Sequence, residues 1–162
     1  MESNAEKARR YLQDLHAAEC GTEQLLLVYA SNSSAPEAIR DASTDVVMQC
    51  RNRQRTIEER LSQLGGSIST TKDWMDTMAS QLTMLWNAGH DNVDKMTVDL
   101  VKTYATGHML RGSYCALSSF CDSVGDYGTK ELADEGMRES EEMADRLMPL
   151  IERIARYAPV QV

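Results

Sequence analysis

Residues 12–29, LQDLHAAECGTEQLLLVY, set the expectation for the whole fold. At helical spacing, one face of this stretch is formed by Leu12, Leu15, Glu19, Thr22, Leu26 and Tyr29. This pattern predicts a long amphipathic helix, with Glu19 in the middle of its core stripe. A buried carboxylate needs a cation, a metal ion or a hydrogen-bond partner. The rest of the chain must therefore supply the group that satisfies Glu19.

Helix-start and helix-stop signals divide the rest of the chain into further long helices. Two capping-box patterns, SNAE at residues 3–6 and SAPE at residues 34–37, are expected to begin the first and second helices. The first helix should end near residue 30, and the second should end at the glycine pair 65–66. A third helix is expected over residues 91–124, and a fourth begins near Thr129.

The other helices also carry polar residues on their core stripes. The apolar stripe of the second helix, from Ile39 to Leu64, is interrupted by Arg53 or Gln54. The stripe of the third helix consists of Met96, Leu100, Thr103, Gly107, Leu110, Tyr114, Leu117 and Cys121. The stripe of the fourth helix consists of Leu132, Gly136, Glu139, Met143, Leu147, Leu150, Ile154 and Tyr157. Glu139 is therefore a second carboxylate at a predicted core position.

A shorter amphipathic helix is predicted over residues 72–87, between the second and third long helices. Its apolar face is formed by Trp74, Met78, Leu82 and Leu85, with Trp86 alongside. Such a face either covers one end of the bundle or packs against a second subunit. Both alternatives stay open, and these five residues are the candidate subunit interface.

These elements predict an all-α, antiparallel four-helix bundle that forms a single domain over residues 1–162. The net charge of −8 argues against nucleic acid or an anionic membrane as a partner. No apolar run is long enough to span a membrane, and the N-terminus does not resemble a signal peptide, so we expect a cytoplasmic protein. Four cysteines without a Cys-x-x-Cys pair are expected to be small buried residues: Cys20, Cys50, Cys115 and Cys121.

The polar core positions suggest the metal site of four-helix carboxylate proteins. In that fold, two helices each give a Glu and the other two each give a Glu-x-x-His motif around two iron or manganese ions. This chain offers Glu19 on the first helix and the pair Glu139 and Glu142 on the fourth. The facing positions of the second and third helices hold Cys50, Arg53, Gly107 and Leu110. The set of ligands is therefore incomplete.

Four runs of sequence carry a resemblance to a known family. They are LQDLHAAE at residues 12–19, ERLSQLG at 59–65, HMLRGSY at 108–114 and ESEE at 139–142. In this order they resemble the YciF-type ferritin-like stress proteins. The resemblance implies a dimeric ferritin-like bundle, a connection to stress responses and di-metal ligands. When the ligand positions of the family are carried over to this sequence, Glu19, Glu139 and Glu142 are the metal ligands that remain.

Three interpretations of Glu19 and Glu139 follow from the sequence. In the first, one or both side chains rotate to the flank of the bundle and are solvated. In the second, they hold a metal. In the third, Arg53 replaces the metal and bridges them in a buried ion pair. Arg53 is the basic residue that the register of the second helix places near the core at mid-bundle depth, and a guanidinium can bond a carboxylate through two parallel donors.

The function predicted from the sequence is that of a non-catalytic ferritin-like bundle with a degenerate di-metal site and no cofactor. It would act by homo-oligomerisation, as a homodimer, or by association with another protein, in a stress response. The alternative is a ferritin-like oxidoreductase that binds two iron or manganese ions.

Overall fold

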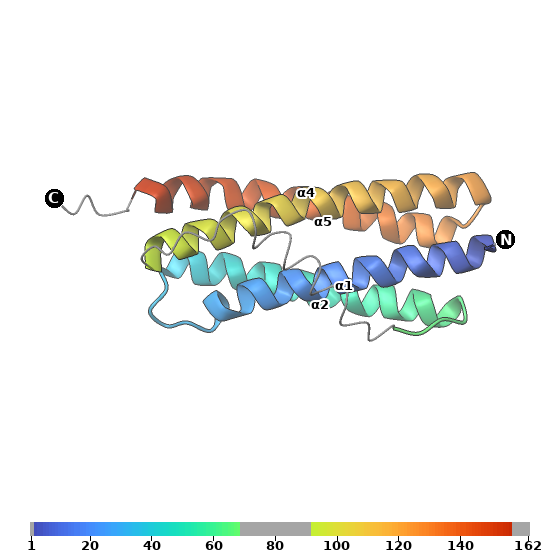
Figure 1. Cartoon of the computed structure of the whole chain (residues 1–162), viewed down its shortest axis with the longest axis horizontal. Helices are drawn as coiled ribbons and strands as arrows, with labels where there is room; N and C mark the ends of the chain where they lie inside the picture. The colour runs from blue at the N-terminus through green and yellow to red at the C-terminus, as the bar shows by residue number, and fades with distance from the viewer. Residues whose placement is uncertain (1, 69–91, 157–162) are drawn as a thin grey trace.

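The computed structural model describes residues 2–68 and 92–156, which form four long helices (Figure 1). Their bounds are Asn4–Ala30 for α1, Glu37–Gln63 for α2, Asn92–Val124 for α4 and Tyr127–Arg156 for α5. These two described segments contain no β-strand, so the prediction of an all-α fold is confirmed. The predicted short helix with Trp74, Met78, Leu82, Leu85 and Trp86 lies outside the described residues.

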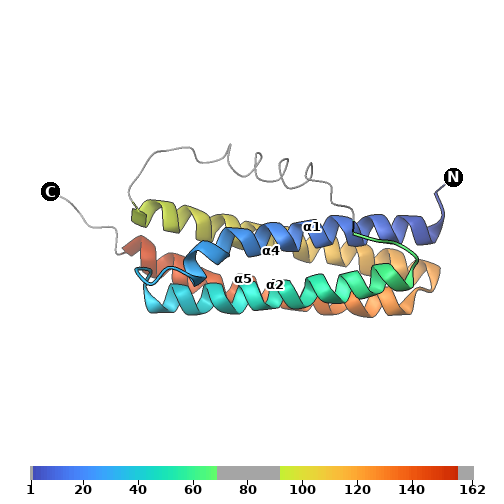
Figure 2. The ribbon, with the colours of Figure 1, turned by 90° about the horizontal axis from the view of Figure 1, so that it is seen from below.

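The four helices pack as two hairpins side by side. Helix α1 pairs with α2 and α4 pairs with α5, while α1 also packs on α4 and α2 on α5 (Figures 1 and 2). Neighbouring helices run in opposite directions, whereas α2 and α4, which lie diagonally across the bundle, run in the same direction (Figure 1). A parallel pair of helices joined by a long connection is the topology of ferritin-like folds.

Local signals explain where the helices begin and end. Ser3 forms the predicted capping box of α1, since its hydroxyl accepts from the Glu6 N–H and the Glu6 carboxylate accepts from the Ser3 N–H. Helix α2 ends in a Schellman turn in which Gly65 has φ of +72° and the Gly66 N–H donates to the Leu61 carbonyl at 2.8 Å.

The second predicted capping box is wrong. Helix α2 begins only at Glu37, its N-cap is Pro36, and no side chain caps it. Ser34 instead lies in the preceding turn, where its N–H donates to Asn32 Oδ1 at 2.9 Å. A box starting at Ser34 would require Ala35 to be helical, and the following proline disfavours that conformation.

The core lies along the predicted stripes. Its fully buried members include Leu12, Leu26, Ile57, Leu61, Leu100, Leu110, Tyr114, Leu117, Met143 and Leu147. Cys50 and Cys121 are buried and Cys20 is half-buried, but Cys115 is exposed. The prediction that all four cysteines are buried is therefore wrong for Cys115, because it follows the core residue Tyr114 and points about 100° away around the helix.

One end of the bundle is closed by arginine side chains. Arg9 of α1 donates to the Leu64 carbonyl at 3.0 Å. Arg60 of α2 reaches across to the start of α5, where Nε donates to Thr129 Oγ1 at 2.8 Å and Nη2 donates to Asp126 Oδ1 at 2.5 Å.

None of the described helices is long and apolar enough to cross a membrane.

Candidate functional site

Glu19 is the buried carboxylate at the centre of the molecule. Its position on the core face of α1 leaves its side chain 0% exposed. At this depth no solvent can satisfy the two carboxylate oxygens, so protein groups must do so.

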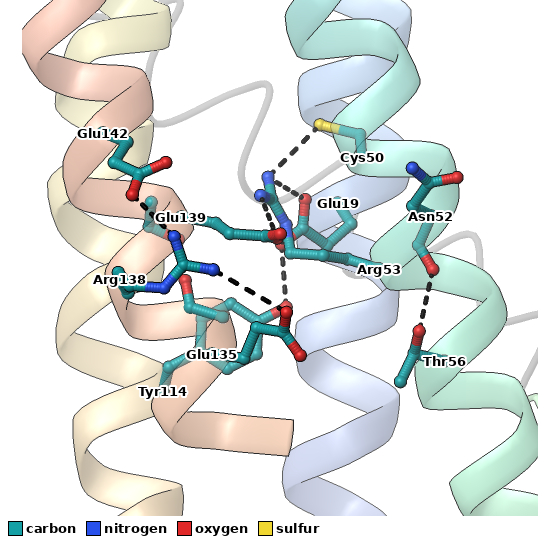
Figure 3. Close-up of polar contacts among 12 residues, drawn as sticks. Glu19, Cys50, Asn52, Arg53, Thr56, Tyr114, Glu135, Arg138, Glu139 and Glu142 are labelled. Carbon is teal, nitrogen blue, oxygen red and sulfur yellow. Dashed lines mark hydrogen bonds and ion pairs between the residues drawn. The ribbon is translucent and has the colours of Figure 1, made fainter. Parts of the chain in front are cut away.

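Arg53 of α2 supplies the cation. Its Nε donates to Glu19 Oε1 at 2.6 Å and its Nη2 donates to Glu19 Oε2 at 3.0 Å (Figure 3). This is the bidentate geometry in which a guanidinium bonds a carboxylate most strongly. Only 6% of the Arg53 side chain is exposed.

Glu139 of α5 binds the outer side of the same guanidinium. Arg53 Nη1 donates to Glu139 Oε2 at 3.1 Å, and the Glu139 side chain is 24% exposed (Figure 3). A cavity of about 220 Å³ between α2 and α5 is lined by both Arg53 and Glu139. Arg53 therefore joins a fully buried carboxylate on α1 to a partly solvated one on α5.

Tyr114 of α4 completes the network. Its hydroxyl donates to Glu19 Oε1 at 2.8 Å, so all four described helices contribute a side chain to one polar cluster. The ring has room because Gly136 of α5 lacks a side chain, and a Cβ at that position would lie 2.5 Å from Tyr114 Cε1. We call Glu19, Arg53, Tyr114 and Glu139 the central cluster.

The sequence placed Tyr114 on a core stripe but did not predict it as a site residue. The available signal was chemical, because a buried tyrosine hydroxyl usually requires a hydrogen-bond partner. The buried carboxylate of Glu19 was an acceptor that needed hydrogen-bond donors. The glycine at position 136 was a second, weaker signal, since a glycine inside a helix often permits a close approach.

Burial and charge shift the pKa values of Arg53, Tyr114 and the adjacent Cys50. Burial alone would lower the pKa of the Arg53 guanidinium, but the adjacent Glu19 carboxylate raises that pKa above its usual value, so Arg53 stays charged. Burial and the charge of Glu19 raise the pKa of the Tyr114 hydroxyl well above its usual value. The same two causes raise the pKa of the Cys50 thiol, whose Sγ lies 3.7 Å from Arg53 Nη2.

The third candidate ligand, Glu142, and the half-exposed Glu58 with its partner His16 lie apart from the central cluster. Glu142 accepts from Arg138 Nη1 at 2.6 Å on the same helix (Figure 3). His16 places Nε2 at 2.8 Å from Glu58 Oε1. The structure thus brings Glu19 and Glu139 together through Arg53 and leaves Glu142 in a separate ion pair.

The residues of the cluster do not fit a di-metal centre. The guanidinium of Arg53 bonds both oxygens of Glu19 and one oxygen of Glu139, which are the atoms that would coordinate metal. The nearby Cys50 thiol would have to lose its proton to act as a ligand, and its raised pKa opposes this. Within residues 2–68 and 92–156, no group of three or more His, Cys, Asp or Glu residues is arranged to hold a metal ion.

The sequence matches one protein family over nearly its whole length. The family described as "Domain of unknown function (DUF892)" matches residues 8–158. The chain belongs to the DUF892 family. A search of curated proteins finds no match to the sequence.

Solved structures of other proteins share the fold of this DUF892 chain. The stress protein YciF of E. coli has a TM-score of 0.78 at 16% identity, with 97% of this chain and 99% of that chain covered. A protein from Xanthomonas campestris pv. campestris has a TM-score of 0.76 at 22% identity, covering 94% and 93% of the two chains. A dodecameric thioferritin from Bacteroides fragilis has a TM-score of 0.73 at 16% identity, covering 96% and 90%. The predicted ferritin-like fold and the resemblance to YciF are confirmed.

Proposed function

We propose that this DUF892 protein is a ferritin-like bundle that works without a di-metal centre and acts by association rather than by catalysis. The observation that carries this proposal is the position of Arg53. Its guanidinium lies between the carboxylates of Glu19 and Glu139 and supplies, as a covalent part of the chain, the positive charge that a metal would otherwise supply.

The association half of the proposal has two supports. The thioferritin from B. fragilis that shares the fold is described as dodecameric. In addition, residues 72–87 contain both tryptophans of the chain, and aromatic residues are enriched where subunits meet. The partner we propose is a second copy of the chain, in a homodimer. The fold shared with the stress protein YciF supports a role in a stress response, in the cytoplasm.

Metal analysis of the purified protein tests the proposal. Protein from cultures grown with and without added iron is freed of loosely bound metal and analysed for iron and manganese. We expect well below one of either ion per chain in both preparations, because Arg53 already bonds the available carboxylates. Two tightly held ions per chain would overturn the proposal and support the di-iron or dimanganese oxidoreductase instead.

A further inference from the structure

Cys20, His16 and Glu58 form a chain of hydrogen bonds where α1 packs against α2. The Sγ of Cys20 lies 3.7 Å from Nδ1 of His16, one helical turn earlier on α1. On the other side of the imidazole ring, Nε2 lies 2.8 Å from Oε1 of Glu58 on α2. We call these three residues the Cys20 relay, and they are distinct from the four residues of the central cluster.

The carboxylate of Glu58 fixes which nitrogen of His16 carries a proton. An ionised carboxylate only accepts hydrogen bonds, so Nε2 must donate to it. In the neutral ring Nδ1 then keeps its lone pair, and this nitrogen faces the Cys20 thiol. His16 is only 8% exposed, so packing also holds the ring in place. The arrangement is that of a nucleophile, a base and a group that orients the base.

Cys20 needs such a base in order to react, because the thiolate is the nucleophilic form of cysteine. Burial raises the pKa of its thiol, and so do the nearby carboxylates of Glu23, Glu58 and Glu19. The thiol therefore keeps its proton until a base takes it. A proton transferred to Nδ1 turns His16 into an imidazolium, whose charge the Glu58 carboxylate stabilises from the opposite side of the ring.

The surroundings of the thiol restrict the kind of reagent that it can meet. Cys20 is half-buried, and no described residue stands within 4 Å of the position that a Cβ on the next residue, Gly21, would take. A small reagent can therefore approach, whereas the carboxylates nearby repel an anionic one. Cys20 also lies inside α1, where the backbone N–H groups are already bonded within the helix. They cannot stabilise an oxyanion, which disfavours acyl transfer.

We propose that Cys20 is a covalent modification site for small, uncharged α,β-unsaturated carbonyl compounds, and that His16 is the base in the reaction. The thiol proton passes to Nδ1 of His16 as the sulfur forms a bond to the β-carbon. The electron pair of the carbon–carbon double bond moves to the α-carbon, which then takes the proton from Nδ1. The addition has no leaving group and needs no oxidant. It is stoichiometric, so it goes beyond the proposed association function and does not depend on it.

Labelling with N-ethylmaleimide at neutral pH tests the proposal, because this reagent is a small, uncharged compound of the required class. The rates at Cys20 and Cys115 are measured in the same protein by peptide mass spectrometry. Cys115 is the internal control, since it is exposed on α4 and none of the described residues bonds its thiol. In H16Q the rate at Cys20 should fall by about tenfold or more, while the rate at Cys115 stays unchanged.

Glu58→Gln separates this role from a structural one. The Glu58 side chain is 41% exposed, so the variant should fold even if H16Q does not. Glutamine can still accept from Nε2 but carries no charge to stabilise the imidazolium, so the rate at Cys20 should fall several-fold. If the pair only joined α1 to α2, its loss would loosen this contact and expose Cys20, and the rate would rise.

The control variant is E152Q, which removes the same charge from an exposed ion pair with Arg156 on α5. It should leave both rates unchanged. A rate at Cys20 that is unchanged or higher in E58Q would overturn the proposal, and so would the same result in folded H16Q. A wild-type protein in which N-ethylmaleimide labels Cys115 but not Cys20 would overturn it as well.

Discussion

At the scale of single residues, the central cluster shows how a bundle can keep a carboxylate in its core. Glu19 receives two donors from Arg53 and one from Tyr114, so the desolvated charge is both paired and hydrogen-bonded. Removing one member of such a network leaves the others buried and unsatisfied, which costs more than the network itself contributes. The close approach of Tyr114 to Gly136 is a precondition for this geometry.

Replacement of Gly136 by alanine tests that precondition. The new Cβ would lie 2.5 to 2.7 Å from three atoms of the rigid Tyr114 ring, so the ring must move and its bond to Glu19 weakens. We expect Gly136→Ala to lower the free energy of unfolding by about 1–3 kcal/mol, measured by urea denaturation.

Gly112→Ala is the matched control for this change. Gly112 also lies inside a helix, but nothing stands within 4 Å of the position its Cβ would take. Alanine there should stabilise the protein by about 0.5–1 kcal/mol. Equal effects of the two substitutions would show that Gly136 makes no special room for Tyr114.

At the scale of elements, the Asp126 carboxylate caps the start of α5 and also binds Arg60 near the end of α2. Burial raises the pKa of Asp126, but hydrogen bonds from the Thr129 side chain and N–H, and the nearby Arg60, outweigh this and lower the pKa below its usual 3.8. A carboxyl group with a lowered pKa in the folded state stabilises the protein above its unfolded-state pKa, and this stabilisation is lost as the pH falls through the lower, folded-state value.

Asp126→Asn removes the negative charge but keeps a hydrogen bond, because the amide oxygen can still accept from the Thr129 N–H. We expect the variant to be about 1–3 kcal/mol less stable than the wild type at pH 7. The difference should shrink as the pH is lowered below about 4, as measured by urea denaturation at several pH values. Asp122→Asn, at an exposed position near the end of α4, should show neither effect, and a pH-independent difference for Asp126→Asn would contradict the account.

The sequence was sufficient for the four described helices, apart from the start of α2, and for part of the site. Helical spacing places Glu19 and Glu139 on core stripes without any tertiary information. Counting back from the glycine stop at the end of α2 places Arg53 near the core as well. The structure brings these three side chains together. The start of α2 was mispredicted because a capping-box pattern and a proline gave conflicting signals, and the backbone restriction before Pro36 prevailed. Tyr114 was missed because its role depends on packing against another helix, which spacing along one helix does not reveal.

At the scale of the whole molecule, the chain combines a polar centre with a surface that we propose for association. The sequence predicts this surface at Trp74 and Trp86, on a segment outside the described residues.

Trp74→Ala combined with Trp86→Ala tests this surface. Large aromatic residues often dominate the binding energy of an interface, so we expect the double variant to sediment as a smaller species than the wild type at equal concentration. Met48→Ala, which removes a side chain that is 59% exposed on α2, should leave the sedimentation coefficient unchanged. A wild-type protein that is monomeric at high concentration would show that this segment only covers its own bundle.

The central cluster joins all four described helices into one unit, because Glu19, Arg53, Tyr114 and Glu139 come from α1, α2, α4 and α5. If Arg53 is the cation that balances the core, then removing it should destabilise the entire bundle. Removing the carboxylates as well should restore stability, since apolar residues of similar size can replace a complete buried network at little cost.

Urea denaturation of two variants tests this claim most directly. Arg53→Met should lower the free energy of unfolding by about 3–5 kcal/mol, and the triple variant R53M/E19L/E139L should recover most of that loss. Arg51→Met, which removes an arginine that is 52% exposed and pairs with Glu23, should cost no more than about 1 kcal/mol. An Arg53→Met variant that unfolds at the urea midpoint of the wild type would contradict the account, because it would show that the core of this bundle does not depend on the charge of Arg53.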